Sequence, residues 1–203
     1  ADPLRDLRAA ALSGARPFFE TDPRPTPAGA RVLAKSVADA LAQHPTLADV
    51  NRSAFSSTEG VQVTLTSSMR VQLQTACQSE LPAVIAQSFT TSRETEGAAN
   101  TLTDLAAGQQ DTLVLLGTGT TATTALNLPG FISEATGIET LSYGVANGGA
   151  FAAISSYLTS ADFQAAPPRV LVWEMPVSAS MAAHGDQPLR ELVAAATNTC
   201  PGN

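Results

Sequence analysis

The feature that most constrains the fold of this chain is the apolar run Leu113–Leu116, which ends in Gly117-Thr118-Gly119. Such a run, breaking into glycine and hydroxyl residues, predicts a buried strand at 112–116 followed by a turn. In open α/β sheets ligands bind outside the carboxyl ends of parallel strands, so this turn is a candidate site. It has neither the serine of a nucleophile elbow nor the lysine of a phosphate-binding loop. A plain glycine turn with Thr120 or Thr121 capping the next helix is the simpler interpretation.

Length and charge narrow the class of protein. A chain of 203 residues can form one domain with a sizeable core, and we expect a single domain over 1–203. The net charge is −7, and the 11 basic residues are scattered, which leaves no basic stripe for nucleic acid. The apolar runs are far shorter than the roughly 20 residues of a membrane span. No export signal opens the sequence, so any such signal is expected to be absent or already removed.

The few cysteines and histidines argue against a metal or redox centre. Cys77 and Cys200 lack CxxC spacing, and His44 and His184 belong to no metal-ligand pattern. The sequence therefore predicts no metal and no other cofactor. It leaves open a disulfide or two free thiols.

The apolar patterns along the chain alternate between helical and extended periods. Helices are expected over 3–13 and from Thr26 to about 43, with a brief strand at 17–19. Alternating apolar residues predict a β-hairpin insert over 61–74, and the polar stretch 88–110 predicts a loop. The later elements are expected to be strand 112–116, helix from about 120, strand 138–143, helix 150–158, strand 169–174 and helix 187–196. This order predicts an α/β fold with three layers, in which helices cover both faces of a parallel, flavodoxin-like sheet.

Four segments carry a resemblance in order and spacing: Thr21–Arg31, Val114–Gly119, Gly148–Phe151 and Val170–Pro176. Together they resemble the SGNH-hydrolase-like domain of AlgX/AlgJ-type alginate O-acetyltransferases, over most of residues 2–176. That family has an Asp-x-His-Trp-Thr-Pro segment ahead of its Gly-Thr-Ser nucleophile turn, and this chain has the same order. The resemblance implies an SGNH-like fold, a role in exopolysaccharide O-acetylation or export, and a periplasmic or secreted location.

Two further expectations follow from the resemblance. The periplasm sustains disulfides, so Cys77 and Cys200 are expected to be joined if the protein is exported. Family members also have a strand and helix upstream of the segment that matches Asp2–Leu4. Either the full protein is longer, or another segment fills that place in the sheet.

The departures from the family pattern fall on its catalytic triad. Asp22 stands at the family's catalytic aspartate, but Arg24 stands at its histidine, Pro25 at its tryptophan and Gly119 at its nucleophilic serine. An arginine is always charged at neutral pH and cannot act as the base, and a glycine has no nucleophile. Transfer through an acetyl-enzyme needs a covalent carrier. The resemblance therefore implies a non-catalytic pseudoenzyme that binds polysaccharide or serves as a scaffold.

Two other functions remain as alternatives. In the first, the chain is an active carbohydrate O-acetyltransferase or acetylesterase with a relocated nucleophile. Thr118 is the candidate nucleophile, Thr120 and Thr121 offer neighbouring hydroxyls, and His184 could supply the base. In the second, a small-ligand module cradles a phosphate in the turn from Gly117 to Thr121, although that turn lacks Lys and Arg.

The expected ligand is a polysaccharide at the carboxyl edge of the sheet. Glycines at strand ends let a ligand approach the backbone closely, and helix N-terminal N–H groups can bind its oxygens. The predicted binding residues are Gly117, Thr120, Gly148, Gly149 and Arg31, with Arg24 and Arg31 expected to recognise any uronate. Other proteins of an exopolysaccharide assembly are possible partners, whereas nucleic acid and a membrane span are not expected.

Overall fold

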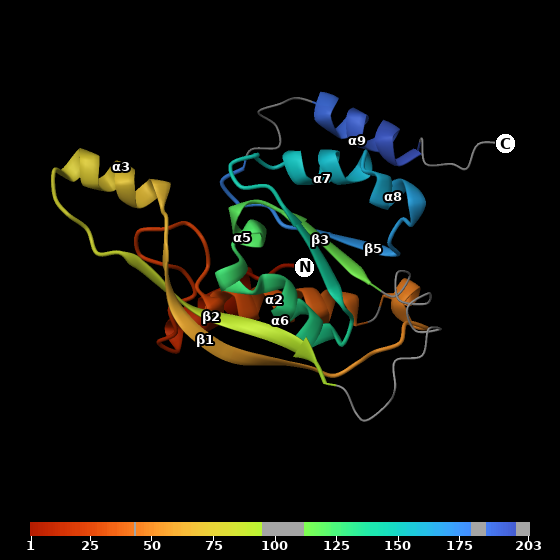
Figure 1. The fold of residues 1–203 in the computed structure, drawn as a ribbon, viewed down its shortest axis with the longest axis horizontal. Helices are drawn as coiled ribbons and strands as arrows, with labels where there is room; N and C mark the ends of the chain where they lie inside the picture. The colour runs from red at the N-terminus through yellow and green to blue at the C-terminus, as the bar shows by residue number, and fades with distance from the viewer. Residues whose placement is uncertain (43, 95–111, 180–185, 198–203) are drawn as a thin grey trace. The chain divides into compact units, whose positions relative to one another are not determined.

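The computed structural model of the protein describes residues 1–42, 44–94, 112–179 and 186–197 (Figure 1). The chain divides into two compact units. The first comprises Ala1–Thr95 with Thr123–Ile138, and the second comprises Glu96–Ala122 with Glu139–Asn203. The single domain over 1–203 stays a prediction.

The first unit combines helices with a two-stranded antiparallel ribbon. The ribbon pairs β1 (Phe55–Leu65) with β2 (Val84–Arg93). The helix α2 (Pro27–Leu41) packs against α6 (Leu128–Thr136), and α6 also contacts both strands. The other elements of this unit are α1 (Leu4–Leu12), the 3-10 turns η1 (Pro45–Leu47) and η2 (Thr124–Leu126), and α3 (Ser68–Cys77).

The predicted start of α2 is confirmed, and the predicted strand before it is reduced to a single bridge. The Thr26 hydroxyl accepts the backbone N–H of Gly29 at 3.2 Å, while Pro27 occupies the first turn, where no N–H is needed. Residues 17–19 form no extended strand, and only Phe18 bridges to Pro25. The loop from Phe19 to Thr26 is thereby folded back on itself.

The predicted hairpin over 61–74 is wrong in its second strand. Val61–Leu65 does belong to β1, but Met69–Leu73 lies in α3, and the partner of β1 is β2. Ser67 explains the helix, because its hydroxyl accepts the N–H of Arg70 at 3.2 Å as an N-cap. The alternation of Met69, Val71 and Leu73 does not mark a half-buried strand, since α3 has no buried residue.

The predicted loop over 88–110 is also wrong in its first part, because residues 88–93 belong to β2. These residues are mostly polar, so they lack the apolar alternation that predicts a strand. Their pairing with β1 nevertheless makes them one. Ser57 and Thr91, for example, share a cross-strand hydrogen bond of 2.7 Å between their hydroxyls. Residues 95–111 lie outside the described part of the chain.

The second unit is built on a parallel sheet with the strand order β4-β3-β5. Its strands are β3 (Leu113–Gly117), β4 (Thr140–Gly144) and β5 (Val170–Trp173), all within two residues of the predicted bounds. Its helices are α5 (Gly119–Ala122), α7 (Ala152–Leu158), α8 (Ala161–Ala165) and α9 (Gln187–Thr197). The parallel sheet with intervening helices confirms the predicted α/β class.

The strand at the centre of this sheet owes its place to its sequence. Every residue of β3 is buried, as expected of an apolar run in a central parallel strand. Val114 and Leu116 belong to a core cluster with Ile154, Tyr157 and other side chains of α7. This core fixes β3, and with it the turn that follows.

The helix expected from about 120 is broken into three short pieces: α5, η2 and α6. Asn127 interrupts it with a left-handed backbone, at φ 51°. Pro129 then falls in the first turn of α6, where its missing N–H costs no hydrogen bond.

No helix within the described part of the chain has the length and apolar character needed to cross a bilayer.

Candidate functional site

β3 ends in a glycine, Gly117, against which two side chains pack. A Cβ on Gly117 would collide with the Thr121 hydroxyl and the Glu174 carboxylate. The absence of a side chain at residue 117 lets these two groups come against the strand end. Gly119 differs, because a Cβ there would meet no atom within 4 Å.

Glu174 holds the turn in place from the neighbouring strand. It follows β5 directly, and its carboxylate accepts hydrogen bonds from the Thr118 N–H at 2.8 Å and the Thr121 hydroxyl at 3.0 Å. The Thr118 hydroxyl lies 3.1 Å from both carboxylate oxygens. The N–H of Thr118 and the hydroxyls of Thr118 and Thr121 therefore all donate hydrogen bonds to the Glu174 carboxylate.

Glu174 is the site residue that the sequence prediction missed. The available signal was its position after the last predicted strand, because the carboxyl ends of parallel strands share one edge. Thr121 and Thr120 lie inside α5 rather than at its cap position, so the predicted capping role is wrong. Both are buried, and the Thr121 hydroxyl serves Glu174 instead.

The predicted glycines after β4 belong to the same edge of the second unit. β4 and β3 end side by side at Gly144 and Gly117, and the N–H of Val145 donates to Gly117 O at 2.9 Å. Gly148 and Gly149 lie in the exposed loop that follows, where Gly149 has a positive φ of 68°. The indole N–H of Trp173 donates to Ala150 O at 3.0 Å, which ties this loop to β5.

Asp22 and Arg24 form a nearly buried ion pair in the first unit. The Asp22 side chain is 1% exposed and the Arg24 side chain 18%. The guanidinium contacts the carboxylate twice, at 2.8 Å through Nε and 2.5 Å through Nη2. Arg24 also donates to Thr123 Oγ1 at 2.9 Å and to Thr66 O at 2.7 Å. All three guanidinium nitrogens are therefore committed to acceptors of this chain.

This arrangement fixes the charge of Asp22. Burial alone raises the pKa of the Asp22 carboxyl, but hydrogen bonds from the Arg24 side chain and backbone, together with its charge, outweigh burial. The pKa is lowered below its ordinary value of 3.8. Asp22 thus stays ionised and paired with a permanent cation, rather than orienting an imidazole base.

Arg31, the other predicted binding cation, is also committed within the first unit. It pairs with Glu134 at 2.9 Å and lies over the ring of Phe131, with its guanidinium carbon 4.1 Å from the ring centroid. These contacts connect α2 with α6. The charge of Arg31 is therefore balanced within the protein.

The predicted site residues thus form two local groups. Gly117, Thr118, Gly119 and Thr120 lie with Glu174 in the second unit, while Asp22, Arg24 and Arg31 lie in the first. His184 and Cys200 lie outside the described residues, so the proton-acceptor role and the disulfide stay predictions; Cys77 is exposed. Over the ranges that the structure describes, no three His, Cys, Asp or Glu side chains gather in a metal site.

Comparison with known proteins relates this geometry to a family. Residues 1–177 match the family described as "SGNH hydrolase-like domain, acetyltransferase AlgX". The alginate biosynthesis protein AlgX of Pseudomonas aeruginosa is 28% identical over 165 residues, which is 81% of this chain and 34% of AlgX. The chain thus spans about a third of that relative's length.

Solved structures agree with this assignment at the level of the fold. A structure of Pseudomonas aeruginosa AlgX superposes with a TM-score of 0.78 and 24% identity, covering 98% of this chain and 50% of AlgX. The O-acetyltransferase domain of Pseudomonas putida AlgJ gives 0.71 and 20%, covering 95% of this chain and 66% of that one. These similarities confirm the predicted SGNH-like α/β fold, and the chain belongs to the family of the SGNH hydrolase-like domain of the acetyltransferase AlgX.

Proposed function

We propose that this chain is a non-catalytic member of its family, which binds a polysaccharide or serves as a scaffold in exopolysaccharide O-acetylation or export. The observation that carries the proposal is the pairing of Asp22 with Arg24, at the positions of the family's acid and base. The proposed location is the periplasm or the cell exterior, and other proteins of the same apparatus are proposed partners. Relatives named for alginate biosynthesis support this context.

The chemistry of the altered positions supports a loss of catalysis. Acyl transfer through a covalent intermediate needs a nucleophile and a base that accepts its proton. Gly119 offers no nucleophile, and Arg24 is a permanent cation whose nitrogens already donate to Asp22, Thr123 and Thr66. The ion pair thereby gives Asp22 a structural role.

The carboxyl edge of the sheet in the second unit is the proposed binding surface. The loop with Gly148 and Gly149 is exposed, and a Cβ on Gly149 would meet no atom within 4 Å, so a ligand can approach the backbone there. Arg24 and Arg31 already serve acceptors within the protein, which weakens the support for a uronate contact through them. We therefore expect modest affinity, particularly for a polyanion that the net charge of −7 repels.

A relocated nucleophile is the second candidate, and one observation favours it. The Thr118 hydroxyl lies 3.1 Å from the Glu174 carboxylate, within the distance that joins a nucleophile to a base. Against it, the same carboxylate also binds the Thr118 N–H and the Thr121 hydroxyl, as expected of a structural acceptor. The alternative that this turn binds phosphate has less support still. The hydrogen-bond donors of the turn already bind the Glu174 carboxylate, whose negative charge would repel a phosphate.

Turnover of an activated acetyl ester, measured beside saccharide binding, tests the proposal. We expect no turnover above the buffer rate, and weak binding of an oligosaccharide by calorimetry. Thr118→Val and Thr121→Val are matched variants, because each removes one hydroxyl that donates to Glu174. Clear wild-type turnover that Thr118→Val abolishes and Thr121→Val retains would establish the relocated nucleophile. The absence of both turnover and saccharide binding would leave only a scaffold.

A further inference from the structure

The helix α3 lies outside the core of the first unit. None of its ten residues is buried, and no helix or strand in the described part of the chain packs extensively against it. It lies at the end of the ribbon, where the chain passes from β1 to β2 (Figure 1). Its attachments are local: the Ser67 hydroxyl donates to Thr21 O at 2.7 Å, and the Arg70 side chain donates to Leu81 O and Pro82 O. The helix is therefore held at its base, while its sides are largely uncovered.

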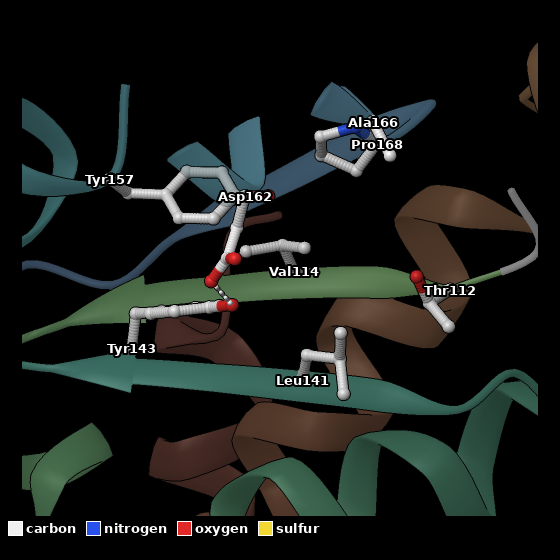
Figure 2. A pocket seen from close by; sticks show the side chains of 8 residues that line it. All are labelled: Thr112, Val114, Leu141, Tyr143, Tyr157, Asp162, Ala166 and Pro168. Atoms are coloured by element: carbon white, nitrogen blue, oxygen red, sulfur yellow. Dashed lines mark hydrogen bonds between the residues drawn. The ribbon is translucent and has the colours of Figure 1, made fainter. Parts of the chain in front are cut away.

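Short helices of the second unit are covered by packing. α7 has seven residues and buries Ile154 and Tyr157 in the core beside the sheet. α8 has five residues and buries Phe163, and its Asp162 accepts a hydrogen bond from the Tyr143 hydroxyl of β4 at 3.1 Å (Figure 2). Isolated helices shorter than about 12–15 residues are marginal in water, because most helix stability in proteins comes from packing. The ten residues of α3 lack that packing within this chain.

One side of α3 is apolar. Met69, Leu73 and Ala76 follow one another at intervals of four and three residues, which places them on the same face of a helix. The Leu73 side chain is 37% exposed, and Ala76 is also exposed. This stripe has the pattern of a surface that packs against another helix.

The two charges at the ends of α3 oppose its own dipole. Arg70 lies in the first turn, at the positive end of the helix, and Glu80 follows the last turn, at the negative end. Neither pairs with an opposite charge anywhere in the described ranges. A second α3 lying antiparallel reverses both relations, because each Arg70 then meets the negative end of the other helix and its Glu80.

The same antiparallel register also matches the apolar stripe. The pairs Arg70–Glu80 and Leu73–Ala76 are both centred on residues 74–75, so one alignment of two copies forms both. It sets a large side chain of each helix against a small one of the other. The segment 60–92 carries no charge besides Arg70 and Glu80. Two copies with a net charge of −7 therefore meet little repulsion at this surface.

We propose that α3 is a self-association helix, which packs antiparallel against the α3 of a second copy of this chain across a two-fold axis. The interface is isologous, with Leu73 and Ala76 at its centre and an Arg70–Glu80 pair at each end. Packing against the second copy supplies the contacts that α3 lacks in one chain. The inference depends neither on saccharide binding nor on the loss of catalysis.

The concentration dependence of the mass tests the proposal. Two ten-residue helices bury less than the roughly 1,200 Å² of a stable interface, so the dimer should be weak, with a dissociation constant on the order of 0.1 mM. Sedimentation equilibrium of the full chain at increasing concentration measures this constant. A chain that stays monomeric up to about 1 mM would overturn self-association.

A matched pair of variants tests the location. Leu73→Asp and Thr75→Asp add the same charge to α3, but residues two positions apart do not share a helix face. Leu73→Asp brings like charges together at the centre of the interface and should weaken the dimer at least about tenfold. Thr75→Asp lies away from the interface and should weaken it less than about threefold. Equal effects of the two variants would overturn the assignment of the stripe.

Charge exchange tests the antiparallel register. Glu80→Arg places two arginines at each end of the interface, and Arg70→Glu places two glutamates there, so each variant alone should dimerise less than the wild type. A mixture of the two restores an Arg–Glu pair at both ends and should recover the dimer. Failure of a mixture of folded variants to dimerise would contradict the antiparallel register. Circular dichroism checks the folding of each variant.

Hydrogen exchange of the wild type gives a second readout, which is needed because Arg70→Glu also removes the bonds to Leu81 O and Pro82 O. The amides of α3 should gain protection as the protein concentration rises, whereas those of α2, which packs within its own unit, should not. Exchange in α3 that does not change with concentration would overturn the proposal.

Discussion

At the scale of single residues, the pairing of Asp22 with Arg24 gives the Asp22 carboxylate a partner that is always charged. A carboxylate that in the family pattern precedes a histidine here binds a guanidinium through two hydrogen bonds, at 1% side-chain exposure. A buried ion pair of this kind contributes little more to stability than a well-packed apolar pair. Removing one partner, however, leaves a buried charge without a partner, which is strongly destabilising. The stability of the loop between Phe19 and Thr26 should therefore depend on both members.

Arg24→Ala should lower the free energy of unfolding by about 3 kcal/mol, because it leaves the Asp22 carboxylate buried without its partner. Urea denaturation of wild type and variant measures the difference. Arg16→Ala is the control, since the Arg16–Glu20 pair is exposed on both sides and should contribute little. Equal small losses in the two variants would contradict a structural role for the Asp22–Arg24 pair.

The acid dependence of stability should also report on Asp22. The pKa of this carboxyl is lowered in the folded protein, so its contribution is present at neutral pH and is lost as the pH falls through the folded pKa. The stability gap between wild type and Asp22→Asn should be largest at about pH 7 and narrow progressively below about pH 4. Urea midpoints across this range provide the measurement, and a gap that does not narrow on acidification would rule out the lowered pKa.

At the scale of elements, the ends of three parallel strands form the candidate binding edge of the second unit. β3 ends in the glycine turn, β4 leads into the loop with Gly148 and Gly149, and β5 is followed by Glu174. Glu174 joins two of these strand ends, because its backbone N–H donates to Leu116 O at 2.7 Å and its carboxylate accepts from Thr118 and Thr121. The geometry of the turn therefore depends on the close approach at Gly117.

Gly117→Ala should destabilise the protein by about 1–3 kcal/mol, because its Cβ would overlap Thr121 and Glu174. Gly119→Ala should change stability by less than about 1 kcal/mol, since its Cβ has open space and alanine restricts the unfolded chain. Thermal unfolding of the two variants compares them directly. A destabilisation at residue 119 as large as that at residue 117 would contradict the described turn.

The same elements explain how much the sequence could predict. The strands of the second unit were predictable, because each is a short apolar or alternating run between turn signals, and β3 is apolar throughout. The second strand of the ribbon was not predictable, since Ser88–Arg93 is mostly polar. Its partner residues in β1 also lie 30 or more positions earlier in the chain, as for Glu59 and Phe89. Local periodicity likewise missed α3, where Ser67 rather than an apolar stripe marks the helix.

Candidate residues could be named from the sequence, but their partners could not. Asp22, Gly117 and Thr118 stand out beside the family pattern. The partners of Arg24 include Thr66 and Thr123, which are 42 and 99 residues distant, and the partner of Thr118 is 56 residues distant. Such contacts arise from tertiary packing, which no local pattern encodes.

At the scale of the whole molecule, the chain has the fold of its family, and we propose that the residues at its triad positions are altered. It spans about a third of the length of AlgX from Pseudomonas aeruginosa, so the activity and partners of the full protein are proposals. A retained fold with exposed glycines in the loop after β4 can bind a ligand without transforming it. The central claim is accordingly that no residue of this chain carries an acyl group.

Intact-mass spectrometry after incubation with an activated phosphonate tests that claim most directly, because the reagent leaves a stable adduct on a reactive hydroxyl. The expected result is an unchanged mass for the wild type, Thr118→Val and Thr121→Val, while an active serine hydrolase in the same reaction is labelled. A single stoichiometric adduct on the wild type and on Thr121→Val, absent from Thr118→Val, would contradict the account and assign Thr118 as a nucleophile.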